Sequence, residues 1–154
     1  IEVGALKLAD RLRGALDQQL VLYCVGADKV AGVLRRVGPD WILLDERADR
    51  EALLPLTAVA SVAGLGPLSA PGDGGVVASR LDFRYALRGL ARDRSGVAVT
   101  LFDGSALMGT IDRVGADFVE VAEHPTGELR RVRAVRQMRT VPLHAIAVVR
   151  ASAG

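Results

Sequence analysis

An internal repeat is the feature of this sequence that most restricts its fold. Residues 32–42 (GVLRRVGPDWI) align with residues 109–119 (GTIDRVGADFV) at a constant offset of 77. Residues 54–59 (LPLTAV) align with residues 141–146 (VPLHAI) at an offset of 87, so the second copy carries ten more residues between its two segments. A chain that holds one pattern twice is expected to build the same small structural unit twice.

Each copy is predicted to contain one helix followed by five short strands. In the second copy the apolar residues Val97, Val99 and Leu101 alternate along the chain, as is typical of a strand. Asp103-Gly104 then predicts a tight hairpin turn, because glycine tolerates the positive φ that such a turn needs. The helices are predicted over residues 3–19 and 79–94, and the strands within residues 20–63 and 96–150.

The same pattern predicts two units, residues 1–65 and residues 76–152. Between them, residues 66–75 (GPLSAPGDGG) are rich in glycine and proline, which favours a flexible linker. A hydrophobic core is marginal in a unit of this size. We therefore expect the two copies to pack against each other or against a second chain.

The composition predicts a core of aliphatic side chains. Half of the residues are hydrophobic but only 4% are aromatic, and the net charge is +2. The single cysteine, Cys24, is expected to be a small buried apolar residue. No run of 18 apolar residues is present, so no transmembrane helix is predicted. We expect a cytoplasmic protein.

Two short motifs of the second copy resemble the Sm-like family, and within it the bacterial Hfq-type proteins. The first motif reads Val99-x-Leu101-x-Asp103-Gly104, then Gly109-x-Ile111 and Asp117-Phe118-Val119. The second reads Val141-Pro142-Leu143-His144-Ala145-Ile146, similar to the His-Ala-Ile of the Hfq-type version. The resemblance implies a mainly β (α+β) fold of two tandem Sm-like, SH3-type small barrels, each preceded by a helix.

The resemblance also implies that the protein binds single-stranded RNA. Carried over residue by residue, the base-stacking aromatic of the third strand matches Phe118, and the base-contacting histidine matches His144. In the first copy the aromatic position is Trp41. The lysine that contacts phosphate in the family is replaced by leucine in both copies, which weakens the implied RNA site. The alternative is that Trp41 and Phe118 are half-buried strand residues.

An arginine-rich segment is the second candidate site. Residues 128–139 (ELRRVRAVRQMR) hold one acidic residue and five arginines, namely Arg130, Arg131, Arg133, Arg136 and Arg139. On a long hairpin these side chains could follow a phosphate backbone, because arginine forks onto phosphate and stacks on bases. Two alternatives stay open: a charged edge strand that resists aggregation, and a surface that docks an acidic protein.

No motif for catalysis, metal binding or cofactor binding is present. The sequence lacks a glycine-rich phosphate loop and a Cys-x-x-Cys pair, and its two histidines, His124 and His144, lie far apart. We therefore expect a non-enzymatic protein without metal or cofactor.

Apolar strands at the end of each copy predict self-association. Residues 53–56 and 58–63, and their counterparts 141–143 and 145–149, would promote aggregation if their edges were exposed. An internal pseudo-dimer and a three-chain ring both satisfy this pattern. The first functional hypothesis is an oligomeric RNA-binding protein. The alternative is a protein–protein interaction scaffold or regulatory module that has lost the RNA pocket.

Overall fold

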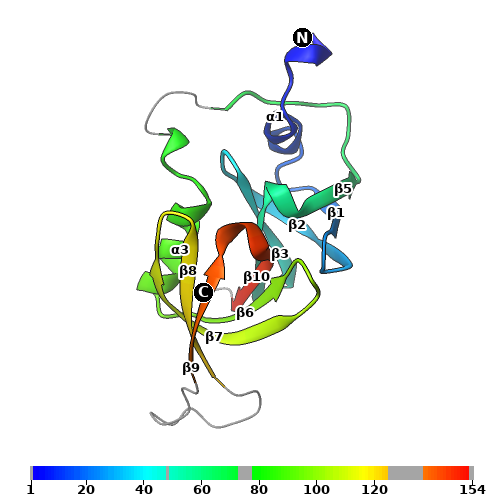
Figure 1. Ribbon diagram of the computed structural model, residues 1–154. Helices are drawn as coiled ribbons and strands as arrows, with labels where there is room; N and C mark the ends of the chain where they lie inside the picture. Colours follow the sequence, from blue (N-terminus) through cyan, green and yellow to red (C-terminus); the bar gives the residue numbers. More distant parts are fainter. Residues whose placement is uncertain (1, 48, 73–77, 125–136, 153–154) are drawn as a thin grey trace.

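The computed structural model describes residues 2–47, 49–72, 78–124 and 137–152, and within them the protein is mainly β. Its ten strands form one continuous, open, antiparallel sheet (Figure 1). The described α-helices are α1 (Leu8–Arg13) and α3 (Phe83–Arg92). The strands are β1 (Gln19–Cys24), β2 (Lys29–Val37), β3 (Trp41–Arg47), β4 (Arg50–Pro55), β5 (Val59–Ala63), β6 (Gly96–Leu101), β7 (Ala106–Val114), β8 (Phe118–Glu123), β9 (Gln137–Pro142) and β10 (Ile146–Ser152).

The order of strands across the sheet repeats between the two halves of the chain. The order is β5-β1-β2-β3-β4 in the first half and β10-β6-β7-β8-β9 in the second, and β4 pairs with β10 where the halves meet. Strands β2 and β7 have the same length and start 77 residues apart. A 3-10 turn precedes β5 and another precedes β10, 87 residues later, at Leu56–Ala58 and Leu143–Ala145.

The prediction of two tandem barrels is wrong, because the halves share a single sheet. At the junction Leu53 lies opposite Val149, and Glu51 lies opposite Ala151. This pairing satisfies backbone groups of β4 and β10 that would be unpaired if each half formed a separate, open sheet. It also covers apolar strands whose exposure would be unfavourable.

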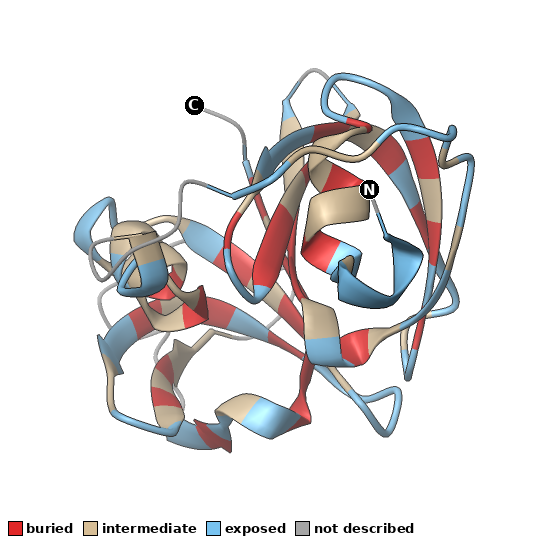
Figure 2. Cartoon of the chain, turned by 90° about the horizontal axis from the view of Figure 1, so that it is seen from above, coloured by how far each residue is buried: buried red, intermediate tan, exposed pale blue. Residues whose placement is uncertain are grey.

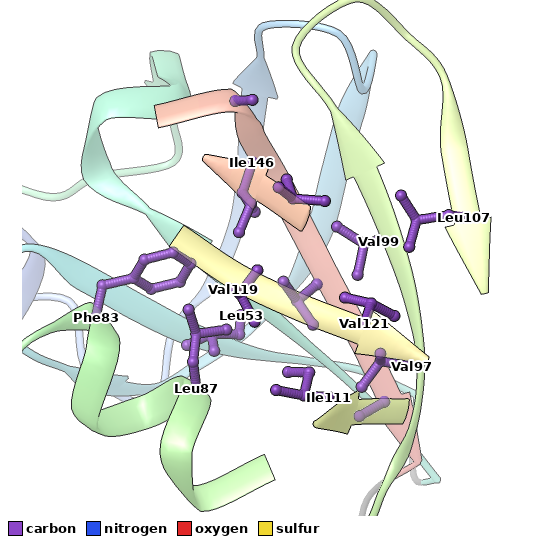
Figure 3. Close-up of a cluster of buried hydrophobic side chains, with 14 of the residues drawn as sticks. Leu53, Phe83, Leu87, Val97, Val99, Leu107, Ile111, Val119, Val121 and Ile146 are labelled. Atoms are coloured by element: carbon purple, nitrogen blue, oxygen red, sulfur yellow. The ribbon is translucent and has the colours of Figure 1, made fainter. Parts of the chain in front are cut away.

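The hydrophobic cores of the two halves are shared across the same junction. Trp41 and Leu53 of the first half belong to the core cluster built mainly by the second half. Conversely, Ala147 and Val148 of β10 belong to the core cluster of the first half. Figure 3 shows Leu53 among the side chains of the second half, with Phe83 and Leu87 of α3 pointing toward it. Neither half therefore encloses its core alone.

The first helix is shorter than the predicted range of residues 3–19. It ends at Arg13, and Asp17 has a positive φ of 67°. Beyond the helix, the Asp17 N–H donates to the Leu34 carbonyl and the Leu34 N–H donates to the Gln18 carbonyl. Pairing with β2 therefore replaces the helical hydrogen bonds that the apolar spacing predicts.

The second helix, α3, lies within the predicted range and is anchored by the first half. Asp82 caps it by accepting a hydrogen bond from the Tyr85 N–H at 3.1 Å. Asp40, in the turn between β2 and β3, accepts a second one from the Phe83 N–H at 2.9 Å. The start of α3 is thus fixed by both halves of the chain.

Part of the predicted linker is held against α1. The Arg11 guanidinium donates to the Gly66 carbonyl at 2.8 Å, and the Ala70 N–H donates to the Asp10 carbonyl at 2.9 Å. Gly14 permits this approach, because a Cβ at that position would overlap the backbone of Leu68. Residues 66–70 therefore follow the helix as an ordered strap.

Strands β5 and β9 are the two outer strands of the sheet and lie at opposite ends of the molecule (Figure 1). Buried residues alternate with more exposed ones along several strands, and both outer strands carry exposed residues (Figure 2). No helix in the described part of the chain is long and apolar enough to cross a membrane.

Candidate functional site

Trp41, the stacking candidate of the first copy, is a core residue. Its side chain is 3% exposed, and its indole Nε1–H donates to the Leu81 carbonyl at 2.7 Å. The Arg36 guanidinium lies 5.0 Å from the ring centroid, at cation–π distance. With one side of the ring facing Arg36 and almost no exposed surface, the indole is closed to a nucleotide base in this structure.

Phe118 and His144, the candidates of the second copy, lie at the same end of the sheet. Phe118 starts β8 opposite Pro142, and the Leu143 N–H donates to the Asp117 carbonyl at 2.9 Å. Phe118 is half-buried against Gly115, where a Cβ would collide with the ring, whereas His144 is exposed. The two candidates that the family resemblance selects in the second copy, Phe118 and His144, therefore lie in the same region of the fold.

Arg139 is the one residue of the arginine cluster that lies within the described part of the chain. Its guanidinium donates to the Glu123 carboxylate at 2.9 Å, and Gln137 donates to the same oxygen at 2.9 Å. These hydrogen bonds, the one from Arg139 first, lower the pKa of Glu123. Arg130, Arg131, Arg133 and Arg136 lie outside the described residues.

Among the residues that the structure describes, no strand pairs with the outer edge of β9, a feature that side-chain patterns did not reveal. The hydrogen bond from Leu143 to Asp117 fixes which residues of β9 point their backbone groups toward β8. Because this direction alternates along an antiparallel strand, Val141 and Arg139 face β8, whereas Thr140 and Met138 face outward. The residues from Gln137 to Thr140 are all exposed.

The same positions of the first copy are already occupied. By the offset of 87, Thr140 and Met138 correspond to Leu53 and Glu51, which pair with Val149 and Ala151 of β10. Within the described ranges, this edge is therefore paired in the first copy and unpaired in the second. The repeat could have drawn attention to this edge, but only the sheet order tells which copy is paired.

A hollow of about 830 Å³ at the seam between the halves was also missed by sequence reasoning. Its lining combines Tyr23 and Lys29 of the first half with Thr100 and Arg150 of the second. The Arg150 guanidinium is already paired, because it donates a hydrogen bond to the Glu46 carboxylate at 2.7 Å. Tyr23 and Thr100 occupy equivalent positions of the two copies at the offset of 77.

The described residues contain no group of three or more histidine, cysteine, aspartate or glutamate side chains placed to hold a metal ion. Comparison with protein-family models, with curated proteins and with solved structures returns no match. The resemblance to the Sm-like family therefore stays a prediction, and the candidate site is argued from geometry alone.

Proposed function

We propose that this protein is a non-enzymatic interaction module that adds an extended, acidic segment of a partner protein to the free edge of β9. The observation that carries the proposal is the pairing of β4 with β10, which occupies the equivalent edge of the first copy. A partner strand would run antiparallel to β9 and bond to the outward N–H and C=O groups of Met138 and Thr140. Such strand addition takes its affinity from main-chain hydrogen bonds.

The charge around β9 favours an acidic partner. Five arginines and one glutamate occupy residues 128–139, which lead into this strand and include its first three residues. Arg139 is neutralised by Glu123, so the segment before β9 would supply most of the attraction. Binding should then weaken as salt rises, because exposed charges are screened.

RNA binding is the second candidate and stays a prediction. The arginine segment and the exposed His144 favour it, and Phe118 is partly accessible. Against it stand the burial of Trp41 and the leucines Leu56 and Leu143 at the positions where the family has a lysine. The edge of β9 is more specific evidence than these features, because its counterpart in the first copy, β4, pairs with a strand of the same chain.

Self-association through β5 and β9 of neighbouring chains also stays a prediction. In the junction within the chain, β10 uses residues Val149 to Ser152, which correspond to residues 62–65 at the other end of the sheet. Strand β5 ends at Ala63, and Gly64 turns the backbone away with a φ of 102°. A second copy could therefore repeat only half of the β4·β10 register, which favours a different protein as the partner.

The test compares two ligands on the purified chain by fluorescence anisotropy. One is a short labelled peptide of alternating glutamate and valine, and the other is a labelled oligouridylate. The proposal expects the peptide to bind in a salt-sensitive manner and Thr140→Pro to weaken it at least about tenfold, since proline removes the outward N–H. Thr140→Val, which keeps that N–H, should bind the peptide like the unsubstituted protein.

Two results would overturn the proposal. If Thr140→Pro bound the peptide as tightly as Thr140→Val, the β9 edge would not be the docking site. If oligouridylate bound and the peptide did not, the RNA hypothesis would replace it. Proline is tolerated at outward positions of an edge strand, so the substituted protein should remain folded, and circular dichroism would check this.

A further inference from the structure

A cavity of about 160 Å³ lies between helix α3 and the face of the sheet at the junction of the two halves. Its floor is a cross-strand row from three neighbouring strands: Leu43 of β3, Leu53 of β4 and Val149 of β10. Trp41, two residues before Leu43, adds an aromatic wall. The cavity therefore exists only because β4 and β10 pair.

The helix above this floor presents small residues. Ala86, Gly89, Leu90 and Asp93 line the cavity, and their spacing places them on one face of α3. An added Cβ at Gly89 would have one heavy atom within 4 Å, the Arg92 Nη2 at 3.9 Å. The space is thus a consequence of glycine and alanine in the stripe that faces the sheet, where larger side chains would fill it.

The rim of the cavity carries two carboxylates and one guanidinium. Glu51, Asp93 and Arg36 are its charged lining residues, and the Arg36 guanidinium lies over the Trp41 ring. Glu51 is half-buried and has no ion pair within the described part of the chain. Its cross-strand neighbour Asp45 is paired with Arg35 at 2.7 Å and adds negative charge nearby. A ligand that enters here meets an apolar interior and a net negative rim.

We propose that this cavity binds a small organic cation, a primary ammonium compound whose apolar part fills the space under α3 and whose ammonium group pairs with Glu51. The size fits, because a cavity of roughly 150 Å³ accommodates a benzene ring. The charge fits, because a half-buried carboxylate without a partner is stabilised by a cation. Mostly apolar walls with a few polar groups are the usual make-up of a small-molecule site.

Burial of Glu51 supports the same assignment. Desolvation raises the pKa of this carboxyl first, the neighbouring Asp45 raises it further, and Arg36 opposes both effects. Burial therefore makes the ionised form of Glu51 less stable, and a bound ammonium group would stabilise that form.

The experiment uses three ligands of one shape and different charge: benzylamine, toluene and benzoate. Trp41 is the only tryptophan of the chain and lines the cavity, so its fluorescence reports binding. The proposal expects benzylamine to bind about tenfold more tightly than toluene, since a hydrogen bond to a charged group is stronger than apolar contact alone. Benzoate should bind more weakly than both.

Two variants separate the contributions. Glu51→Gln keeps the shape and should reduce benzylamine affinity to that of toluene, whereas Gly89→Leu should fill the cavity and abolish binding of both. Equal affinity of the unsubstituted protein for benzylamine and toluene would overturn the proposal. So would preference for benzoate, or benzylamine binding that survives in both variants. Thermal melts of each variant confirm that loss of binding is not loss of fold.

Discussion

At the scale of single residues, two glycines of the second half have opposite roles, one in a helix and one in a strand. Gly89 lies inside α3 with open space at its Cβ position, whereas a Cβ at Gly109 would collide with the Ala122 carbonyl on the neighbouring strand. Gly89→Ala should stabilise the fold by about 0.5–1 kcal/mol, because alanine loses less backbone entropy in a helix. Gly109→Ala should destabilise it by about 1–3 kcal/mol through overpacking.

Urea denaturation of the two variants measures both values. Destabilisation by Gly89→Ala would mean that α3 packs more closely on the sheet than described, and the cavity would then be absent. A neutral Gly109→Ala would mean that β7 and β8 are less closely apposed.

Cys24 is predicted to be unreactive in the native protein. It is 8% exposed, and burial raises the pKa of its thiol to about 11, although the charge of Arg150 acts in the opposite direction. The thiolate is the reactive species, so a disulfide reagent at neutral pH should modify Cys24 only at the rate of unfolding. Measured against the urea-unfolded chain, fast labelling of the native protein would contradict the burial of β1.

Glu51 predicts a pH dependence of stability. Its pKa in the folded state lies above the ordinary value of 4.5, mainly because of burial. The folded state binds the proton of Glu51 more tightly than the unfolded state does. The resulting stabilisation is fully present below the unfolded-state pKa of 4.5 and is lost as the pH rises through the higher folded-state pKa. Glu51→Gln should therefore raise the melting temperature at neutral pH and leave it nearly unchanged in acid. A larger gain in acid than at neutral pH would contradict this sign.

For single residues, the sequence pattern predicted the burial of Cys24, whereas it did not predict the different environments of Trp41 and Phe118. The position of Cys24 in an alternating strand predicts an inward side chain, and the structure places it there. Trp41 and Phe118 have the same place in the repeat, yet Trp41 is buried and bonded to Leu81 while Phe118 is half-buried. The segment before α3 contributes to this difference, because its Leu81 carbonyl accepts a hydrogen bond from the Trp41 indole N–H. Nothing in the local pattern of either residue encodes that cover.

At the scale of elements, the strand offsets of the repeat are reproduced by the structure. Alternation and turn residues are local signals, and they predict strands well where one face is buried. The helix at residues 3–19 was overestimated, because the apolar spacing there competes with backbone pairing between Asp17 and Leu34. Helix α3 begins at Phe83 rather than at residue 79, because Asp82 caps it there and Asp40 of a distant turn accepts a hydrogen bond from the Phe83 N–H.

The ion pair between β10 and β3 tests how these elements are held together. Arg150 and Glu46 are 19% and 17% exposed and lie 2.7 Å apart, 104 residues apart in the sequence. Arg150→Ala should destabilise the fold by about 1–3 kcal/mol, because it leaves Glu46 partly desolvated. The matched control is Asp17→Asn, which removes the charge of an exposed pair (Arg35 46% and Asp17 74% exposed) and keeps a residue that tolerates the positive φ at this position; it should cost less than about 1 kcal/mol.

Chemical denaturation of both variants gives the comparison. Equal and small effects would indicate that the junction is held by strand pairing and apolar contacts alone. Such a result would remove Arg150 from the account of how the halves are joined.

At the scale of the whole molecule, the repeat predicts two similar halves but not the way they join. The apolar runs of β4 and β10 are buried on both faces, and such a run does not tell which strand edge each of them meets. Exposed edges would be unfavourable for both strands because they are apolar. Pairing β4 with β10 covers these edges within one chain, so a second copy is not needed for them. The interleaved cores follow from that pairing, since Leu53 and Val148 each pack in the core of the other half.

The most direct test of this account is native-state hydrogen exchange of the isolated chain. The paired strands β4 and β10 lie inside the sheet, so their amides should exchange about a thousandfold or more slowly than the outward amides of Met138 and Thr140. That result would support both the continuous sheet and the open β9 edge. Rapid exchange of residues 50–55 and 146–152, together with protection of the amides of Met138 and Thr140, would contradict both.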